Sequence, residues 1–172
     1  MEECWTMCRV TTKIVLDKLN KVLSKKKRPE KLVGSNELTD DEMQEAFFFA
    51  DKNKEELSCN DIEQRYEAVY WFSSEAFCYY LPMMLYVCIK EEKVELLFYD
   101  VIIDMLDRQS NIKYWDDFFT TRWRCFSTEE IESIKLWLLW LKDKGYFRNN
   151  TTTFERSMKT LDLLKQREFG VK

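Results

Sequence analysis

The sequence of 172 residues contains no histidine, only three glycines and only two prolines. Histidine is the commonest general base and metal ligand, and it is the middle member of most nucleophilic triads. Its absence therefore argues against an enzyme, a metal site or a cofactor site of those kinds. β-Sandwiches and β-barrels need turn residues at short intervals, and so few glycines and prolines do not supply them. The sequence predicts an all-α protein.

Positive charge is also in short supply, with 27 basic against 31 acidic residues and a net charge of −4. Proteins that bind nucleic acids generally neutralise phosphates with an excess of lysine and arginine. The composition therefore argues against nucleic acid as a partner. One basic run, KKKR at 25–28, keeps a nucleic-acid-associated regulator as a weaker alternative, although solvated charge on a linker is the usual role of such a run.

No apolar run is long enough to cross a membrane, since the longest, at 77–89, has Pro82 in its middle. The first residues, MEECWTMCRV, carry acids where a signal peptide carries bases. We therefore expect a cytoplasmic protein that does not enter a membrane.

The six cysteines form no CxxC pair, and two of them, Cys78 and Cys88, lie inside apolar runs. Free thiols in such runs are typical of a reducing compartment. Cys4 and Cys8 lie one helical turn apart, but with no histidine and no second such pair we expect no zinc site. No cofactor is predicted.

The apolar residues that are present repeat with helical spacing, and 45% of the chain is hydrophobic. Three capping boxes, in which Ser or Thr is followed three residues later by Glu, begin at Thr39, Ser127 and Thr152. Pro82 predicts a kink or a break near 80–82. The expected helices cover residues 3–24, 39–50, 59–70, 73–90, 91–107, 127–145 and 152–168.

These segments predict one compact domain of about six or seven helices over residues 1–172. The stretch 25–38 is basic and polar, and we expect it to be an exposed linker between the first helix and the rest. The stretch 111–125 is predicted to be a loop.

Aromatic residues are unusually frequent, with 12 Phe, 8 Tyr and 6 Trp. One group surrounds Pro82, where a dense set of Tyr and Met is predicted to be helix core or, as an alternative, an adaptable binding face. Tyr80 is the ring that we expect to be exposed. The other group is expected to pack together between 111–125 and the next helix, and it consists of Trp115, Phe118, Phe119, Trp123, Trp137 and Trp140.

Three stretches resemble a family of uncharacterised bacterial proteins. Residues 70–82, YWFSSEAFCYYLP, are similar to the signature F-x-S-x-E-A-F-x-Y-Y-L-P, with Ser74 where Pro is expected. The downstream MLDR at 105–108 is followed by WDDFF at 115–119 and RW at 122–123, and the third stretch is the helix at 127–141. The resemblance implies a cytoplasmic bacterial protein and no catalytic residue, because the family has no established activity.

Surplus acid and surplus aromatics together favour a non-enzymatic protein-binding module. By analogy with small acidic proteins encoded beside toxins, its partner is expected to be another protein such as a cognate toxin, which would make the chain an immunity protein that neutralises it. The residues proposed to meet the partner are Asp40, Asp41, Glu42, Glu45, Asp51, Glu55, Glu56, Tyr80, Asp116 and Asp117.

A hydrolase that works through carboxylates and arginine is the alternative. It requires the polar side chains of the 107–122 region to converge in a cleft, where two carboxylates can divide into acid and base. Adjacent acids on a helix point about 100° apart, so the pair at 116–117 is not expected to converge. The other interpretation is structural: one of these acids caps a helix and the other pairs with Arg122 or Arg124. The residues of this alternative site are Asp107, Arg108, Asp116, Asp117 and Arg122.

Overall fold

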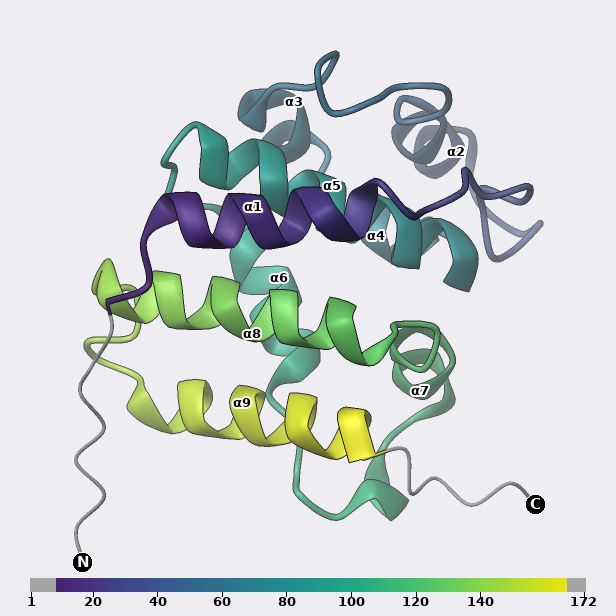
Figure 1. Cartoon of the computed structure of the whole chain (residues 1–172). Helices are drawn as coiled ribbons and strands as arrows, with labels where there is room; N and C mark the ends of the chain where they lie inside the picture. Colours follow the sequence, from purple (N-terminus) through teal and green to yellow (C-terminus); the bar gives the residue numbers. More distant parts are fainter. Residues whose placement is uncertain (1–8, 167–172) are drawn as a thin grey trace, which may run out of the picture.

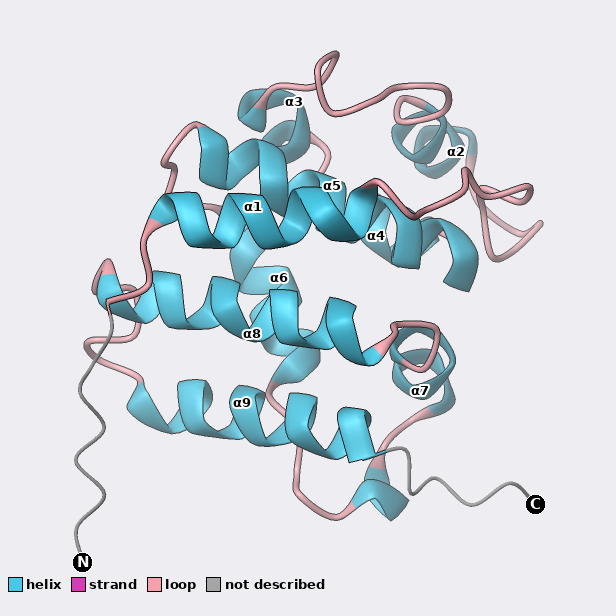
Figure 2. Cartoon of the chain, viewed as in Figure 1, coloured by secondary structure: helices cyan, strands magenta, loops and turns pink. Residues whose placement is uncertain are grey.

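The fold is all-helical, as the sequence predicts (Figures 1 and 2). The structure is a computed structural model that describes residues 9–166, and within that range it contains nine α-helices, one short 3-10 helix and no strand. In chain order the elements are α1 Thr12–Leu23, α2 Asp40–Phe47, α3 Cys59–Gln64, α4 Ala68–Trp71, α5 Ser74–Lys90, α6 Leu97–Leu106, η1 Ile112–Tyr114, α7 Asp117–Trp123, α8 Thr128–Asp143 and α9 Thr151–Gln166.

Helices α1, α8 and α9 lie side by side in one layer (Figure 1). Helix α5 packs behind α1, and α6 crosses behind α8 and contacts α9 and α3. Helices α2 and α4 pack on each other at one end, and α7 packs on α5. Helix α6 therefore lies behind the layer that contains α1.

Side-chain caps place most helix starts where the sequence predicts them. The capping boxes of Thr39 with Glu42 and Ser127 with Glu130 are both formed. Ser58 caps α3 and forms a further box with Asp61.

The predicted box at Thr152 is wrong. Helix α9 already begins at Thr151, because the side chain of Asn150 accepts a hydrogen bond from the backbone N–H of Thr153. The first helix also begins later than predicted, at Thr12, where the Thr11 hydroxyl caps it. Cys4 and Cys8, for which no zinc site is expected, lie outside the described residues.

Pro82 does not break α5, which runs through it from Ser74 to Lys90. The surrounding positions are buried, so packing on α1, α3 and α7 holds the helix together around the missing N–H. The predicted helix over 59–70 is divided into α3 and α4. The predicted loop over 111–125 contains η1 and α7, because Asp116 caps a helical start that aromatic spacing alone did not indicate.

The basic stretch 25–38 is exposed at most positions, yet it is fixed to the domain. The N–H of Gly34 donates to the Trp71 carbonyl at 2.9 Å, and the N–H of Ser73 donates to the Leu32 carbonyl at 2.8 Å. Lys26 is nearly buried and pairs with Glu130. The stretch thus joins α1 to α4, α5 and α8 by specific contacts.

Tyr80, expected to be exposed, is buried at 1% exposure, and that prediction is wrong. Its ring stacks on Phe72 with 5.1 Å between centroids, and burial raises the pKa of its phenol to about 12. Tyr79, one residue earlier, is the partly exposed ring of this pair. The side chain of Tyr80 therefore points into the core and not to solvent, and the group around Pro82 is mostly core.

The second aromatic group is divided. Trp115, Phe119 and Trp123 pack in sequence and reach Phe77 of α5. Trp137 instead packs on Tyr99, and Phe118 is 41% exposed. Within residues 9–166 no helix is long and apolar enough to span a bilayer.

Candidate functional site

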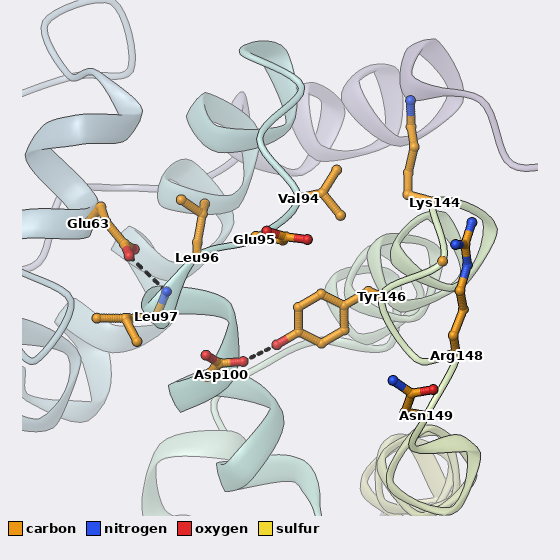
Figure 3. A pocket seen from close by; sticks show the side chains of 11 residues that line it. Glu63, Val94, Glu95, Leu96, Leu97, Asp100, Lys144, Tyr146, Arg148 and Asn149 are labelled. Atoms are coloured by element: carbon orange, nitrogen blue, oxygen red, sulfur yellow. Dashed lines mark hydrogen bonds between the residues drawn. The ribbon is translucent and has the colours of Figure 1, made fainter.

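A hollow of ≈ 740 Å³ lies between the start of α6 and the turn that joins α8 to α9 (Figure 3). Its two sides differ in charge. Carboxylates from α3 and α6 line one side, and Lys144 and Arg148 line the other. Gly145 shapes the basic side, because its φ of +88° is a left-handed conformation that ends α8.

Several of the polar groups around this hollow are used by the fold. The Glu63 carboxylate accepts hydrogen bonds from the N–H groups of Leu97 and Phe98 at 2.9 and 3.2 Å, and it thereby caps α6, whose own N-cap residue cannot do so. Lys144 pairs with Glu92 at 3.7 Å.

Tyr146 donates its phenolic proton to Asp100 across the hollow (Figure 3). Burial and the Asp100 carboxylate raise the pKa of Tyr146, so it stays a neutral donor. This hydrogen bond connects the hollow to the outer surface of α6.

Three aspartates, Asp100, Asp104 and Asp107, follow one another along α6 at spacings of four and three residues. This spacing places them on one face of a helix. Asp107 pairs with Arg156 at 2.8 Å, whereas Asp104 is exposed between its two acidic neighbours. Partial burial, followed by the charges of Asp100 and Asp107, raises the pKa of Asp104.

The acidic surface continues from α6 onto α4 and α2. Burial and the charges of Asp104 and Glu67 raise the pKa of Tyr70. Burial and the charge of Glu67 likewise raise the pKa of Glu45. We call this surface the α6 acidic face, and it consists of Glu45, Glu67, Tyr70, Asp100, Asp104 and Tyr146.

Large apolar side chains border the α6 acidic face. Leu97 is 52% exposed at the hollow beside Asp100, and Phe47 is 49% exposed in a second hollow that Glu45 also lines. Phe118 packs against Tyr70 at 6.3 Å between ring centroids. Exposed apolar side chains beside several carboxylates are a composition found at protein-binding surfaces.

The structure places the predicted partner-binding acids apart. Asp40, Asp41 and Glu42 occupy the first turn of α2, where Glu42 is used by the capping box. Asp41 and Glu45 line the same hollow.

The remaining acids of that set are bound elsewhere. Asp51 pairs with Arg28 at 3.1 Å, and the Glu56 carboxylate accepts a hydrogen bond from the N–H of Asn53. Glu55 lies 3.9 Å from Lys54. Of the predicted set, Glu45 is the member that belongs to the α6 acidic face.

The alternative site over 107–122 does not converge. Arg108 pairs with Asp116, which also caps α7 through the N–H of Phe119, and these bonds lower the pKa of Asp116 although partial burial opposes them. Asp107 instead pairs with Arg156 on α9.

The other two residues of the alternative site, Asp117 and Arg122, line one hollow that does not include Asp107, Arg108 or Asp116. The Arg122 guanidinium donates to the carbonyls of Tyr70 and Phe72 at 3.0 and 2.9 Å. Asp117 is exposed in the first turn of α7. Within residues 9–166 no three acidic or thiol side chains lie together as a metal ion requires. The geometry that a carboxylate hydrolase needs is therefore absent from this region of the described chain.

The basic run 25–28 is occupied by ion pairs. Lys25 pairs with Glu129 at 2.7 Å, together with Lys18 and Lys21 of α1. Lys26 pairs with Glu130. Arg28 pairs with Asp51, so three of the four cations of the run are held in intramolecular ion pairs.

Sequence analysis missed Glu67, Asp100, Asp104 and Tyr146. The aspartate spacing along the predicted helix 91–107 was a usable signal, because residues four and three apart share a helix face. Glu67 and Tyr146 carry no such signal, since they join the surface only through packing of α4 and of the α8–α9 turn.

No protein-family model, no curated protein and no solved structure matches the chain. The family resemblance of residues 70–82, 105–123 and 127–141 therefore stays a prediction from sequence.

Proposed function

We propose that this chain is a protein-binding module that recognises a basic partner through the α6 acidic face. The observation that carries the proposal is the position of Asp104, an exposed carboxylate on one helix face between Asp100 and Asp107. Partial burial, followed by the charges of these two neighbours, raises its pKa. Cationic side chains of a partner would reduce the repulsion between these carboxylates. Binding would thereby remove an electrostatic cost that the free protein carries.

The surroundings of the face suit a protein partner better than a small ion. Leu97, Phe47 and Phe118 supply exposed apolar area beside the charges. Aromatic anchors within a charged rim are typical of protein interfaces, where the apolar contacts provide affinity and the charges steer encounter.

The hollow of Figure 3 gives the partner a place for a long basic side chain. Asp100 lies at its edge, Glu95 lines it, and Lys144 and Arg148 on the far side disfavour a second cation. We expect one lysine or arginine of the partner to enter there while others meet Asp104 and Glu67.

A toxin that acts on nucleic acid or nucleotides is a partner of this chemistry, since its active surface is basic. An immunity protein covers such a surface with carboxylates. This narrower proposal rests on the binding proposal and is tested with it.

The test is co-expression with the product of the neighbouring gene, followed by measurement of the association rate of the purified pair. The double variant Asp100→Asn/Asp104→Asn removes two charges from the face. The matched control, Asp17→Asn/Glu30→Gln, removes two exposed charges elsewhere. We expect the first variant to slow association at least tenfold at low salt and the control to have little effect.

The binding proposal fails if the two double variants associate equally fast, or if the rate of the wild-type pair does not fall as salt is added. The immunity proposal fails separately if the partner binds but its toxicity persists when the chain is co-expressed.

A further inference from the structure

Two cysteines far apart in the sequence meet where α5 begins. The thiol of Cys125, in the turn between α7 and α8, donates to the Ser74 carbonyl at 3.2 Å, and Ser74 lies one helical turn before Cys78. The Cys78 thiol in turn lies 3.3 Å from the Cys125 carbonyl. The Cys125 sulfur also lies 2.7 Å from the Arg122 carbonyl, so both thiols belong to one cluster at the start of α5.

A nearly buried lysine completes this cluster. The Lys26 ammonium donates to the Cys78 sulfur at 3.2 Å, and its side chain is 11% exposed. The ring of Phe126 lies 5.6 Å away and excludes water on one side. A cation held against a thiol favours the thiolate, which is the reactive form.

The two thiols differ in their protonation. The interaction with Cys125, followed by the charge of Lys26, lowers the pKa of Cys78 against the opposing effect of burial. The same interaction, together with burial, raises the pKa of Cys125. Cys78 is therefore the nucleophile of the pair, and Cys125, which is exposed, keeps its proton until the second step.

We propose that Cys78 and Cys125 form a thiol-oxidation site that reacts with hydroperoxides. The Cys78 thiolate attacks the terminal peroxide oxygen, the O–O bond breaks, and a sulfenic acid forms while the other oxygen leaves as alkoxide, or as hydroxide from hydrogen peroxide, and is protonated to the alcohol or to water. Cys125 then gives up its proton and attacks the Cys78 sulfur, and the S–O bond breaks to release water. One peroxide thus oxidises two thiols to one disulfide.

A second thiol pair provides an internal comparison. Cys59 and Cys88 also interact, but they are 2% and 0% exposed. The interaction with Cys88 lowers the pKa of Cys59 against burial and the carboxylates of Glu91 and Glu63, so the two pairs differ mainly in their exposure to solvent. The same oxidant is therefore expected to reach the first pair well before the second.

The experiment treats the full-length chain with one equivalent of hydrogen peroxide, blocks the remaining thiols by alkylation under denaturing conditions, and maps the peptides by mass spectrometry. We expect a cross-linked peptide that joins Cys78 to Cys125, with Cys59 and Cys88 alkylated. In Cys125→Ser the resolving thiol is gone, so dimedone should trap a sulfenic acid on Cys78.

Lys26→Met is expected to slow oxidation of Cys78 several-fold, and Lys26→Arg, which keeps the cation, is expected to retain most of the rate. Circular dichroism confirms that each variant is folded. The proposal is overturned if Cys59–Cys88 or the N-terminal cysteines oxidise first while Cys78 stays reduced. It is equally overturned if dimedone labels no sulfenic acid in folded Cys125→Ser.

Discussion

At the scale of single residues, Arg122 acts as a bridge between α7 and the chain that enters α5. Its guanidinium donates to two backbone carbonyls, those of Tyr70 and Phe72, and lies 3.6 Å from the ring centroid of Phe118. Burial lowers its pKa, which measures how far the charge has been withdrawn from water. Arg122 therefore supplies hydrogen-bond donors to two backbone carbonyls, those of Tyr70 and Phe72, at the chain that enters α5.

We predict that Arg122→Met destabilises the fold by about 1.5–3 kcal/mol, because both carbonyls lose a charged donor. Arg122→Lys should recover little of this loss, since one ammonium cannot reproduce the planar fork that reaches two carbonyls. Urea unfolding at neutral pH measures both variants. A result within ~0.5 kcal/mol of wild type for Arg122→Met would show that the bridge is dispensable.

Asp104 is predicted to cost the folded protein stability. An acid whose pKa is raised in the folded state is favoured when protonated, so stability falls as pH rises from the ordinary aspartate pKa of about 3.9 through the raised one. Asp104→Asn should therefore stabilise the protein at pH 7 by about 0.2–0.5 kcal/mol, the size of a like-charge pair on a helix.

The gain should disappear as pH falls well below the ordinary aspartate pKa of about 3.9, where Asp104 is protonated in both the folded and the unfolded state. Thermal unfolding of both proteins across this range measures the difference. A gain that persists undiminished at low pH would mean that charge repulsion is not its source.

At the scale of elements, α8 depends on its first turn. Ser127 accepts from the N–H of Glu130, and the Glu130 carboxylate accepts from the N–H of Ser127. Glu130 is 9% exposed and also forms an ion pair with Lys26. The N-terminal cap of α8 is therefore linked to the stretch that follows α1.

We predict that Ser127→Ala destabilises the protein by about 1 kcal/mol, while Ser127→Gly costs only a few tenths, because glycine is tolerated at a helix N-cap. Chemical unfolding of the two variants gives the comparison. Equal losses for alanine and glycine would assign the effect to packing of the side chain and not to the cap.

The elements also show what the sequence can predict. Caps such as Thr39 and Ser127 are local, since both partners lie within four residues, and they were identified correctly. The sequence predicts the cap of the last helix at Thr152, but the structure places it at Asn150. Both residue types are acceptable at an N-cap, so the sequence alone does not distinguish the two positions. The orientation of Tyr80 depends on packing.

The candidate site was predicted less well for the same reason. The composition shows a surplus of aromatic residues and of acidic charge. It does not show which of them lie together, because the α6 acidic face joins four segments between Glu45 and Tyr146. Asp107 and Arg108, neighbours in sequence, bind different partners on α9 and α7. Sequence distance does not indicate which charges will meet.

At the scale of the whole molecule, ion pairs join elements that are far apart in the sequence. Three lysines, Lys18, Lys21 and Lys25, surround Glu129 at the start of α8. Behind this layer, Asp107 at the end of α6 pairs with Arg156 of α9.

This arrangement predicts how the protein responds to acid. Hydrogen bonds from Lys25 and Lys21 lower the pKa of Glu129 to about 2. A lowered carboxylate pKa adds stability that is present above the ordinary glutamate pKa of about 4.3 and is lost as pH falls towards the folded value. Glu129→Gln should therefore lower Tm above pH 5, and its difference from wild type should shrink to nothing near pH 2.

Glu132→Gln is the matched control, because Glu132 lies on the same helix and meets one lysine, Lys165, at 2.7 Å. Its effect on Tm above pH 5 should be smaller, since one exposed pair contributes little while several charges in a network contribute more. Scanning calorimetry from pH 7 to pH 2 follows all three proteins. The prediction is wrong if the difference in Tm between wild type and Glu129→Gln does not change with pH. In that case apolar packing stabilises the contact between α1 and α8, and the ion pairs of Glu129 contribute nothing measurable.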